Sequence, residues 1–259
     1  MSPNRQRSLL DWLEPYYPVI RDRTQLPAVP RLLAQRQQEF CLATDLTAAF
    51  VADVCYHGYL PMGESLSRWP LLLIKSHHQR CVLDFAHLHR SRKLKRHARG
   101  LTFAINQNFA TCLRAIADYH SPTWLIDPLC AAFMSLHQQP LRGVALHSIE
   151  IYDGQRLVAG EVGYTTGAIY TSLAGFHRQN GAGSVQLGLL GQVLAQSGFA
   201  FWDLGMELPY KLHLGASCVD RTTFLARWAS HRDARTPDWA MQTLDNAAAI
   251  ALLKAPSTH

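Results

Sequence analysis

The chain has 259 residues, a formal net charge of +6 and 48% hydrophobic residues, a composition that excludes global disorder. No apolar run approaches the roughly 18–20 residues that span a bilayer. The first residues lack a continuous apolar segment and a small-residue cleavage site, so we expect a cytoplasmic protein without a membrane partner. The six cysteines lie far apart without a CxxC pair, which indicates reduced thiols.

The first third of the chain predicts an extension followed by a small domain. Residues 1–35 contain the helix-breaking residues Pro15, Pro18, Pro27 and Pro30. A helix follows, capped by Asp45 or Thr47 and closed at Gly58. Strands are predicted over residues 71–74 and 81–83. We therefore expect a small N-terminal α/β domain over residues 36–80.

A basic segment follows, in which six cations and no acid fall within ten residues: Arg90, Arg92, Lys93, Lys95, Arg96 and Arg99. Charges of a single sign cannot pair with one another, and they create a positive potential suited to a phosphate backbone. We predict a helix that contacts nucleic acid, with a solvated helix face as the plain alternative. His87 and His89 lack a third ligand at recognisable spacing, so we expect no metal.

The rest of the chain predicts a mixed α+β core. The expected elements are a strand over 101–105, helices over 109–119 and 128–137, strands over 145–152, 157–164 and 168–173, a long apolar helix over 184–197, and a strand over 199–204. Asp153-Gly154 between two alternating runs is a strong hairpin signal. This order is typical of an acetyltransferase-type (GNAT) core. We predict a GNAT-like domain over residues 81–235 and a C-terminal helix and tail over 236–259.

The motifs, taken in order over roughly residues 40–230, resemble the leucyl/phenylalanyl-tRNA–protein transferase family. They are Asp45-Leu46 leading to Gly58 and Pro61, His89-Arg90-Ser91-Arg92, Thr123-Trp124-Leu125, Leu136-His137, His147-Ser148-Ile149-Glu150, Leu157-Val158 with Gly160, Gly163 and Gly167, Phe176 with Arg178, and Asp203 with Leu214-Gly215-Ala216. The resemblance implies transfer of an apolar amino acid, such as leucine or phenylalanine, from charged tRNA to an acceptor amine. That amine is typically a protein N-terminal Arg or Lys, and DNA is not expected as a partner. The chain departs from the family at Leu173, where the family has glutamate, at Gly205, where it has glutamine, and at Met62, where it has tryptophan.

Transfer of an activated ester to an amine requires mainly positioning, with one carboxylate to hold the ammonium and help take its proton. Asp203 is the candidate, because it ends the apolar strand FAFWD, where a side chain can face a cleft. The alternative is that Asp203 caps the following turn. No cofactor is expected for this reaction.

Aromatic and polar side chains suggest where the substrate binds. Trp124, Tyr170 and Phe176 are candidates to line a pocket for the aminoacyl end, unless they are plain core residues. Ser148 and Glu150 share one face of the HSIE strand and are further substrate-binding candidates, with an exposed or ion-paired acid as the alternative.

Two other functions remain open. Arg178-x-x-Gly181-x-Gly183, between a strand and a helix, is the pattern with which acetyltransferases cradle the pyrophosphate of acyl-CoA. The chain would then be an acyl-CoA-dependent acetyltransferase. The other alternative is a protein that binds tRNA without chemistry, through the basic segment.

Overall fold

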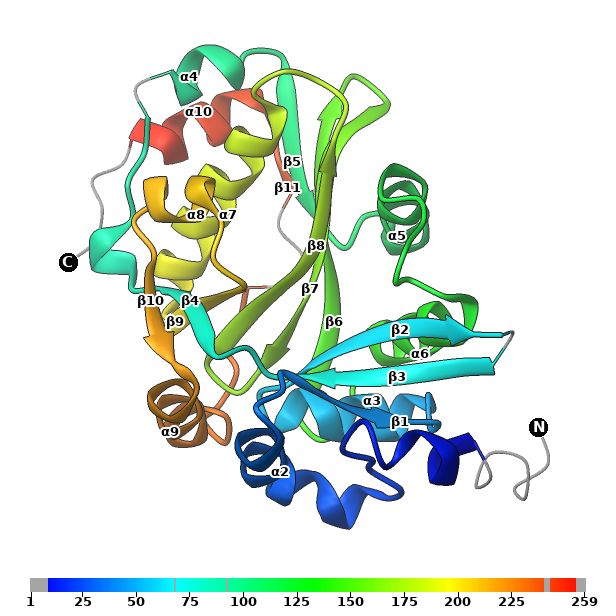
Figure 1. Ribbon diagram of the computed structural model, residues 1–259. Helices are drawn as coiled ribbons and strands as arrows, with labels where there is room; N and C mark the ends of the chain where they lie inside the picture. Colours follow the sequence, from blue (N-terminus) through cyan, green and yellow to red (C-terminus); the bar gives the residue numbers. More distant parts are fainter. Residues whose placement is uncertain (1–8, 68, 92, 240–242, 255–259) are drawn as a thin grey trace.

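The computed structural model describes residues 9–67, 69–91, 93–239 and 243–254, and it shows a mixed α+β fold with two sheets (Figure 1). Within these ranges, the small sheet has the strand order β1-β3-β2 and the large mixed sheet the order β10-β4-β9-β8-β7-β6-β5-β11. No described helix is both long enough and apolar enough to cross a membrane. The predicted α+β class is confirmed at this level.

The small sheet consists of β1 (Phe40–Ala43), β2 (Leu60–Leu66) and β3 (Trp69–Lys75). The helical elements around it are η1 (Arg23–Ala28), α2 (Val29–Arg36) and α3 (Ala48–Tyr56). The cap predicted for α3 is confirmed, because the Thr47 side chain accepts a hydrogen bond from the Phe50 N–H. Strands β1 and β2 were not predicted from the sequence. In β2, Pro61 and Gly63 lower the strand propensity, and pairing with β3 overrides them.

The large sheet and its helices account for the rest of the described chain. Its strands are β4 (Gln79–Leu83), β5 (Leu101–Ile105), β6 (Val144–Asp153), β7 (Arg156–Thr166), β8 (Ile169–His177), β9 (Phe201–Gly205), β10 (Ser217–Asp220) and β11 (Thr243–Leu244). Its helical elements are η2 (Phe85–His87), α4 (Leu94–His97), α5 (Phe109–Tyr119), α6 (Asp127–Gln138), α7 (Ala182–Ser197), α8 (Pro209–His213), α9 (Arg221–His231) and α10 (Asn246–Lys254). The predicted hairpin at Asp153-Gly154 and the long helix that forms α7 are confirmed.

Helices cover both faces of the large sheet, and strand alternation assigns each side chain to one of two cores. Leu146 of β6 packs in the core that contains α5 and α6, whereas Ile149 and Ile151 of the same strand pack in the core that contains α7. Figure 1 shows α5 and α6 on one side of the central strands and α7, with α4, α8 and α10, on the other. An acidic side chain in these strands therefore faces either the core that contains α5 and α6 or the core that contains α7.

The middle of the sheet opens between β8 and β9. These two strands are parallel and pair only over Ile169–Thr171 and Phe201–Asp203, with α7 as their connection. A β-bulge interrupts β8 as well, because Gly163 pairs with Ser172 whereas Val162 pairs with Ala174, which leaves Leu173 as the extra residue. The second half of β8 therefore separates from β9, and this separation positions the site described next.

Candidate functional site

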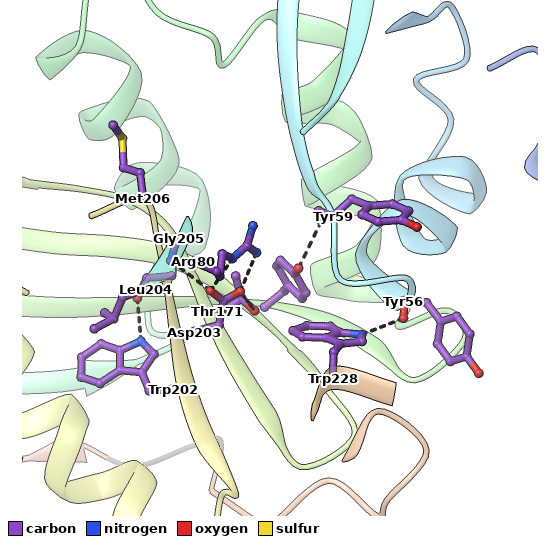
Figure 2. A network of polar contacts seen from close by, with 12 residues as sticks. Tyr56, Tyr59, Arg80, Thr171, Trp202, Asp203, Leu204, Gly205, Met206 and Trp228 are labelled. Carbon is purple, nitrogen blue, oxygen red and sulfur yellow. Dashed lines mark hydrogen bonds and ion pairs between the residues drawn. The ribbon is translucent and has the colours of Figure 1, made fainter. Parts of the chain in front are cut away.

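Asp203 and Arg80 form a buried, two-pronged ion pair near the point where β8 and β9 separate (Figure 2). The Arg80 Nε and a terminal guanidinium nitrogen each donate to one Asp203 carboxylate oxygen over 2.7 Å. The Thr171 hydroxyl donates to the same carboxylate over 3.0 Å, as does the Gly205 backbone N–H. The Asp203 side chain has no exposed surface. The expectation that it faces a cleft is therefore wrong, and its bond to the Gly205 N–H matches the alternative turn role.

A cavity with a volume of about 950 Å³ lies beside this ion pair, since Leu204, the residue after Asp203, lines it. Residues 172–177 of β8 form one wall, and Leu204 with residues of α8 and its flanks forms another. The start of α7 and the basic segment complete it through Gln186, His97 and Lys93. The cavity exists because β8 and β9 separate, which leaves open the space that continued pairing of these two strands would fill.

Glu161 of β7 lines this cavity and is held by three neutral donors. The hydroxyls of Tyr170 and Ser172 donate to its Oε1 over 2.9 Å and 2.8 Å, and the Gln186 side-chain amide donates to its Oε2 over 2.9 Å. Only 3% of the residue is exposed. Burial raises the pKa of Glu161, and the bonds from Ser172, Gln186 and Tyr170 offset part of that rise. This carboxylate is therefore a stronger base than an exposed one.

Lys211 of α8 is the buried cation of the same cavity. Its ammonium donates to the backbone carbonyls of Leu204 and Met206, over 2.5 Å and 2.7 Å. Burial lowers the pKa of Lys211. The ammonium fixes the chain just after β9, so it sets the shape of the wall opposite β8.

The predicted substrate residues do not gather in one pocket. Phe176 lines the cavity. Tyr170 is fully buried behind Glu161, to which its hydroxyl donates. Trp124 is half-buried in the segment just before α6, where it packs edge-on against Phe133. The common pocket expected for the three aromatic residues is therefore wrong, because the bulge and the separate position of α6 keep them apart.

Ser148 and Glu150 lie on the opposite face of the sheet from Glu161. Both are fully buried, and Glu150 accepts hydrogen bonds from the Ser148 hydroxyl, the Tyr152 hydroxyl and the Asn108 backbone N–H. The shared face predicted for the two residues is confirmed. Their predicted place at the substrate pocket is wrong, because neither Ser148 nor Glu150 lines the cavity. Alternation along β6 points them toward α5 instead.

The basic segment is mostly not helical, which corrects the prediction. Within its described residues, only Leu94–His97 form a helix, α4, and no side chain caps its start. The segment contains no acidic residues, which makes its potential positive. For the same reason it lacks the i,i+4 ion pairs that would stabilise a longer helix. Gly100, with a φ of +79°, then ends the segment.

The cations of the segment have different surroundings. Lys93, Lys95, Arg96 and Arg99 are exposed, and Lys93 also lines the cavity. Arg90 donates over 3.1 Å to the carbonyl of Leu253 in α10, so it holds the last helix in place. Arg92 lies outside the described residues. The exposed cations therefore form one positive surface beside the cavity.

Residues 178–181 lie between β8 and α7, as predicted, and Ala182 and Gly183 form the start of α7. Gly181 precedes the first residue of α7 with a φ of +82°. A Cβ atom at this position would clash with the His97 ring of the basic segment. Close packing against α4 therefore gives a structural reason for this glycine, independent of any pyrophosphate.

Glu161, Lys211 and Arg80 were not predicted as site residues from the sequence. For Glu161 a signal existed, because it is the one acid in the otherwise apolar run LVAGEVGY of a long strand. A lone acid in such a run is buried only with hydrogen-bond partners. Arg80 and Lys211 gave no comparable signal, since their partners are distant in sequence or are backbone carbonyls.

Comparisons with known proteins assign the chain to a family. The model of the leucyl/phenylalanyl-tRNA protein transferase family matches residues 82–229, more than half of the 259 residues. The chain is 29% identical over 228 residues to the leucyl/phenylalanyl-tRNA–protein transferase of Azotobacter vinelandii, covering 85% of this chain and 96% of that protein. It is 30% identical over 235 residues to the enzyme of the same name from Pseudomonas fluorescens, covering 87% and 96%. Among solved structures it is similar to FemX, with a TM-score of 0.42 and 10% identity over 78% of each chain. The chain belongs to the leucyl/phenylalanyl-tRNA–protein transferase family.

Proposed function

We propose that this protein is an aminoacyl-tRNA-dependent transferase. It moves leucine or phenylalanine from charged tRNA to an acceptor amine, typically the N-terminal Arg or Lys of a protein. Membership of the family supports the reaction. The observation that carries the proposal for this chain is one cavity that joins a positive surface, an apolar wall and a buried carboxylate.

The apolar wall suits the side chain of the transferred amino acid. Leu173, Ala174 and Phe176 of β8 face the cavity from one side, and Leu204 and Leu208 from the other. A leucine or phenylalanine side chain buried there gains roughly 1.5–3 kcal/mol relative to water. Because the ester bond of charged tRNA is already activated, positioning of this kind supplies much of the catalysis.

The exposed cations beside the cavity suit the phosphate backbone of the tRNA acceptor stem. Lys95, Arg96 and Arg99 extend the positive surface away from Lys93, which is at the cavity itself. A stem bound to these cations would direct its aminoacylated end into the cavity. Neither a cofactor nor DNA nor a membrane is needed for this reaction, and we place the protein in the cytoplasm.

The core that builds the cavity is, in this proposal, an acetyltransferase-type (GNAT) core. The supporting observations are the antiparallel run β6-β7-β8, the helix α7, and the return of the chain into β9 parallel to β8. We keep residues 81–235 as this domain and residues 36–80 as a small N-terminal domain. The extension predicted over residues 1–35 is corrected for its described part, because η1 and α2 bury Leu26 and Leu33 in the same core as α3. Residues 236–259 are the C-terminal helix and tail of this proposal.

Asp203 has a positioning role in this proposal. Its carboxylate is saturated by Arg80, Thr171 and the Gly205 N–H, so it has no free site for an acceptor ammonium. It fixes the start of the segment Leu204 to Met206, whose carbonyls hold Lys211. The shape of the cavity wall therefore depends on it.

The test is transfer of radiolabelled leucine and phenylalanine from charged tRNA to a protein with an N-terminal Arg or Lys. Ala174→Phe fills the cavity wall, whereas Ala131→Phe makes the same change at an exposed position of α6. We expect transfer by the wild type and by Ala131→Phe, and at least a tenfold loss with Ala174→Phe while tRNA binding persists. Tight tRNA binding without transfer by the wild type would instead support a non-catalytic tRNA-binding protein. Saturable acetyl-CoA binding would support the acetyltransferase alternative.

A further inference from the structure

We propose that Glu161 takes the proton from the acceptor's α-ammonium group and so generates the attacking amine. This role rests on the proposed function and names the residue that performs its first chemical step. The residue is a base for the reaction and also an anchor, because a carboxylate attracts the ammonium before it removes the proton.

The first support is the position of Glu161. Among the described residues that line the cavity, it is the only one with a carboxylate. The wall around it is formed by Ser172, Leu173 and Gln186, and the buried ammonium of Lys211 lines the same space. An acceptor amine that reaches an ester in this cavity therefore meets one carboxylate, and that carboxylate is Glu161.

The second support is the hydrogen-bond capacity of Glu161. An ionised carboxylate offers about four acceptor sites. Oε1 accepts from Tyr170 and Ser172, and Oε2 accepts from Gln186 alone, which leaves one site on Oε2 for an ammonium. Within the described ranges, no cationic side chain donates a hydrogen bond to Glu161. Asp203 differs from Glu161, because the Arg80 guanidinium balances its charge and occupies two of its hydrogen-bond acceptor sites.

The third support is energetic. A buried carboxylate whose hydrogen-bond donors are all neutral is costly to ionise, so it attracts either a proton or a cationic ligand, and the Lys211 ammonium of the same cavity offsets only part of that cost. Burial raises the pKa of Glu161, which brings it closer to the range in which a general base works best. The three donors prevent the side chain from turning away, so the free site on Oε2 keeps its position.

The ammonium gives one proton to Glu161, and the neutral amine attacks the ester carbonyl carbon of the aminoacyl-tRNA. The new C–N bond forms, and the C–O bond to the terminal ribose breaks. The ribose oxygen receives the second proton lost by the attacking nitrogen. Glu161 then releases its proton to solvent.

The test compares Glu161→Gln with the wild type across pH, using transfer of leucine to a peptide with an N-terminal Arg. Glu64→Gln makes the same exchange at an exposed position of β2 and serves as the control. We expect Glu161→Gln to lower kcat/KM for the peptide by about 10²–10⁴-fold at pH 6.5, with unchanged charged-tRNA binding. Above roughly pH 8, where an α-amino group is neutral without help, the deficit should shrink.

A purely structural role gives a different result. A deficit that stays constant across pH, or a loss of charged-tRNA binding in Glu161→Gln, would overturn the assignment, as would a wild-type rate at pH 6.5. If Glu161→Gln does not fold, Ser172→Ala replaces it. Loss of that hydrogen bond should raise the pKa of Glu161 and move the acid limb of kcat/KM to higher pH, and an unmoved limb would contradict the role. Absence of transfer by the wild type would refute the proposed function, and this role with it.

Discussion

Arg80 and Asp203, 123 positions apart in the sequence, join β4 to β9 through two hydrogen bonds of 2.7 Å with almost no exposed surface. The carboxylate also accepts from Thr171 of β8, so one buried acid connects three neighbouring strands. This ion pair fixes the place where β8 and β9 begin to separate. The shape of the cavity therefore depends on two residues that lie outside its lining.

Breaking this pair should destabilise the protein strongly. Arg80→Met and Asp203→Asn should each lower the free energy of unfolding by about 3–5 kcal/mol, because each leaves an unpaired buried group. The double variant should cost far less than the sum, since both charges are then absent. Urea denaturation of the wild type and the three variants measures this difference. Additive costs would show that the two side chains do not stabilise the fold as a pair.

Gly205 should resist substitution because of its backbone. Its φ of +75° lies in the left-handed region, and the nearest atom to an added Cβ is the Leu60 Cδ1, at an ordinary 3.7 Å. The cost of Gly205→Ala therefore comes from the backbone and should be about 1–2 kcal/mol. Gly205→Asn should cost less, because Asn tolerates this region. Thermal unfolding of both variants tests the order, and equal stability of wild type and Gly205→Ala would contradict it.

The exposed cations should determine the salt dependence of tRNA binding. Replacing Lys95 and Arg96 with glutamine should reduce the slope of log Kd against log salt concentration by about one for each phosphate that is no longer neutralised. Arg114→Gln, an exposed change on α5, is the matched control. Titrations at several salt concentrations provide the slopes. Parallel lines for the double variant and the wild type would place the tRNA on another surface.

His147 should make stability fall in acid. The ring is buried and bonds to Asn106 and Thr165, and burial lowers its pKa to about 3 from 6.5 in the unfolded chain. Between pH 3 and pH 6.5, the His147 ring is therefore protonated in the unfolded chain and neutral in the folded protein. Stability therefore decreases as pH falls from 6.5 toward 3, by at most about 1.4 kcal/mol per pH unit.

The variant His147→Gln removes this titration. Chemical denaturation at intervals between pH 4 and pH 7 should give a shallower decline for the variant than for the wild type. Curves with the same slope would show that His147 is protonated equally in both states. His77 contributes in the same direction, since burial lowers its pKa to about 4, so the slope should become shallower without disappearing.

Local patterns predicted many elements because each of them depends on short-range chemistry. Asp153-Gly154 supplies the turn between β6 and β7, and Gly198 ends α7 in a left-handed conformation. The elements that were missed depend on distant partners instead. Strand β10 exists because Cys218 and its neighbours pair with β4, far away in the sequence, and β2 forms a strand despite Pro61.

The candidate site was predicted only in part for a related reason. Regular alternation places Tyr170, Ser172 and Phe176 on one face of a strand. The bulge at Leu173 changes the alternation, so Tyr170 packs in the core with α7 while Phe176 packs in the core with α5. A bulge depends on the pairing of two strands, and the residues of β8 alone do not reveal it.

By itself, the sequence determined the α+β class, the hairpin, the long helix α7, the position of the basic segment and the family. These properties follow from turn chemistry, periodicity and the order of short motifs. Only the tertiary structure decided that Asp203 is paired with Arg80 and that Glu161 is the carboxylate of the cavity. The physical reason is that burial and charge pairing depend on residues brought together from distant strands, and the free energy of a carboxylate depends on those neighbours rather than on its place in the chain.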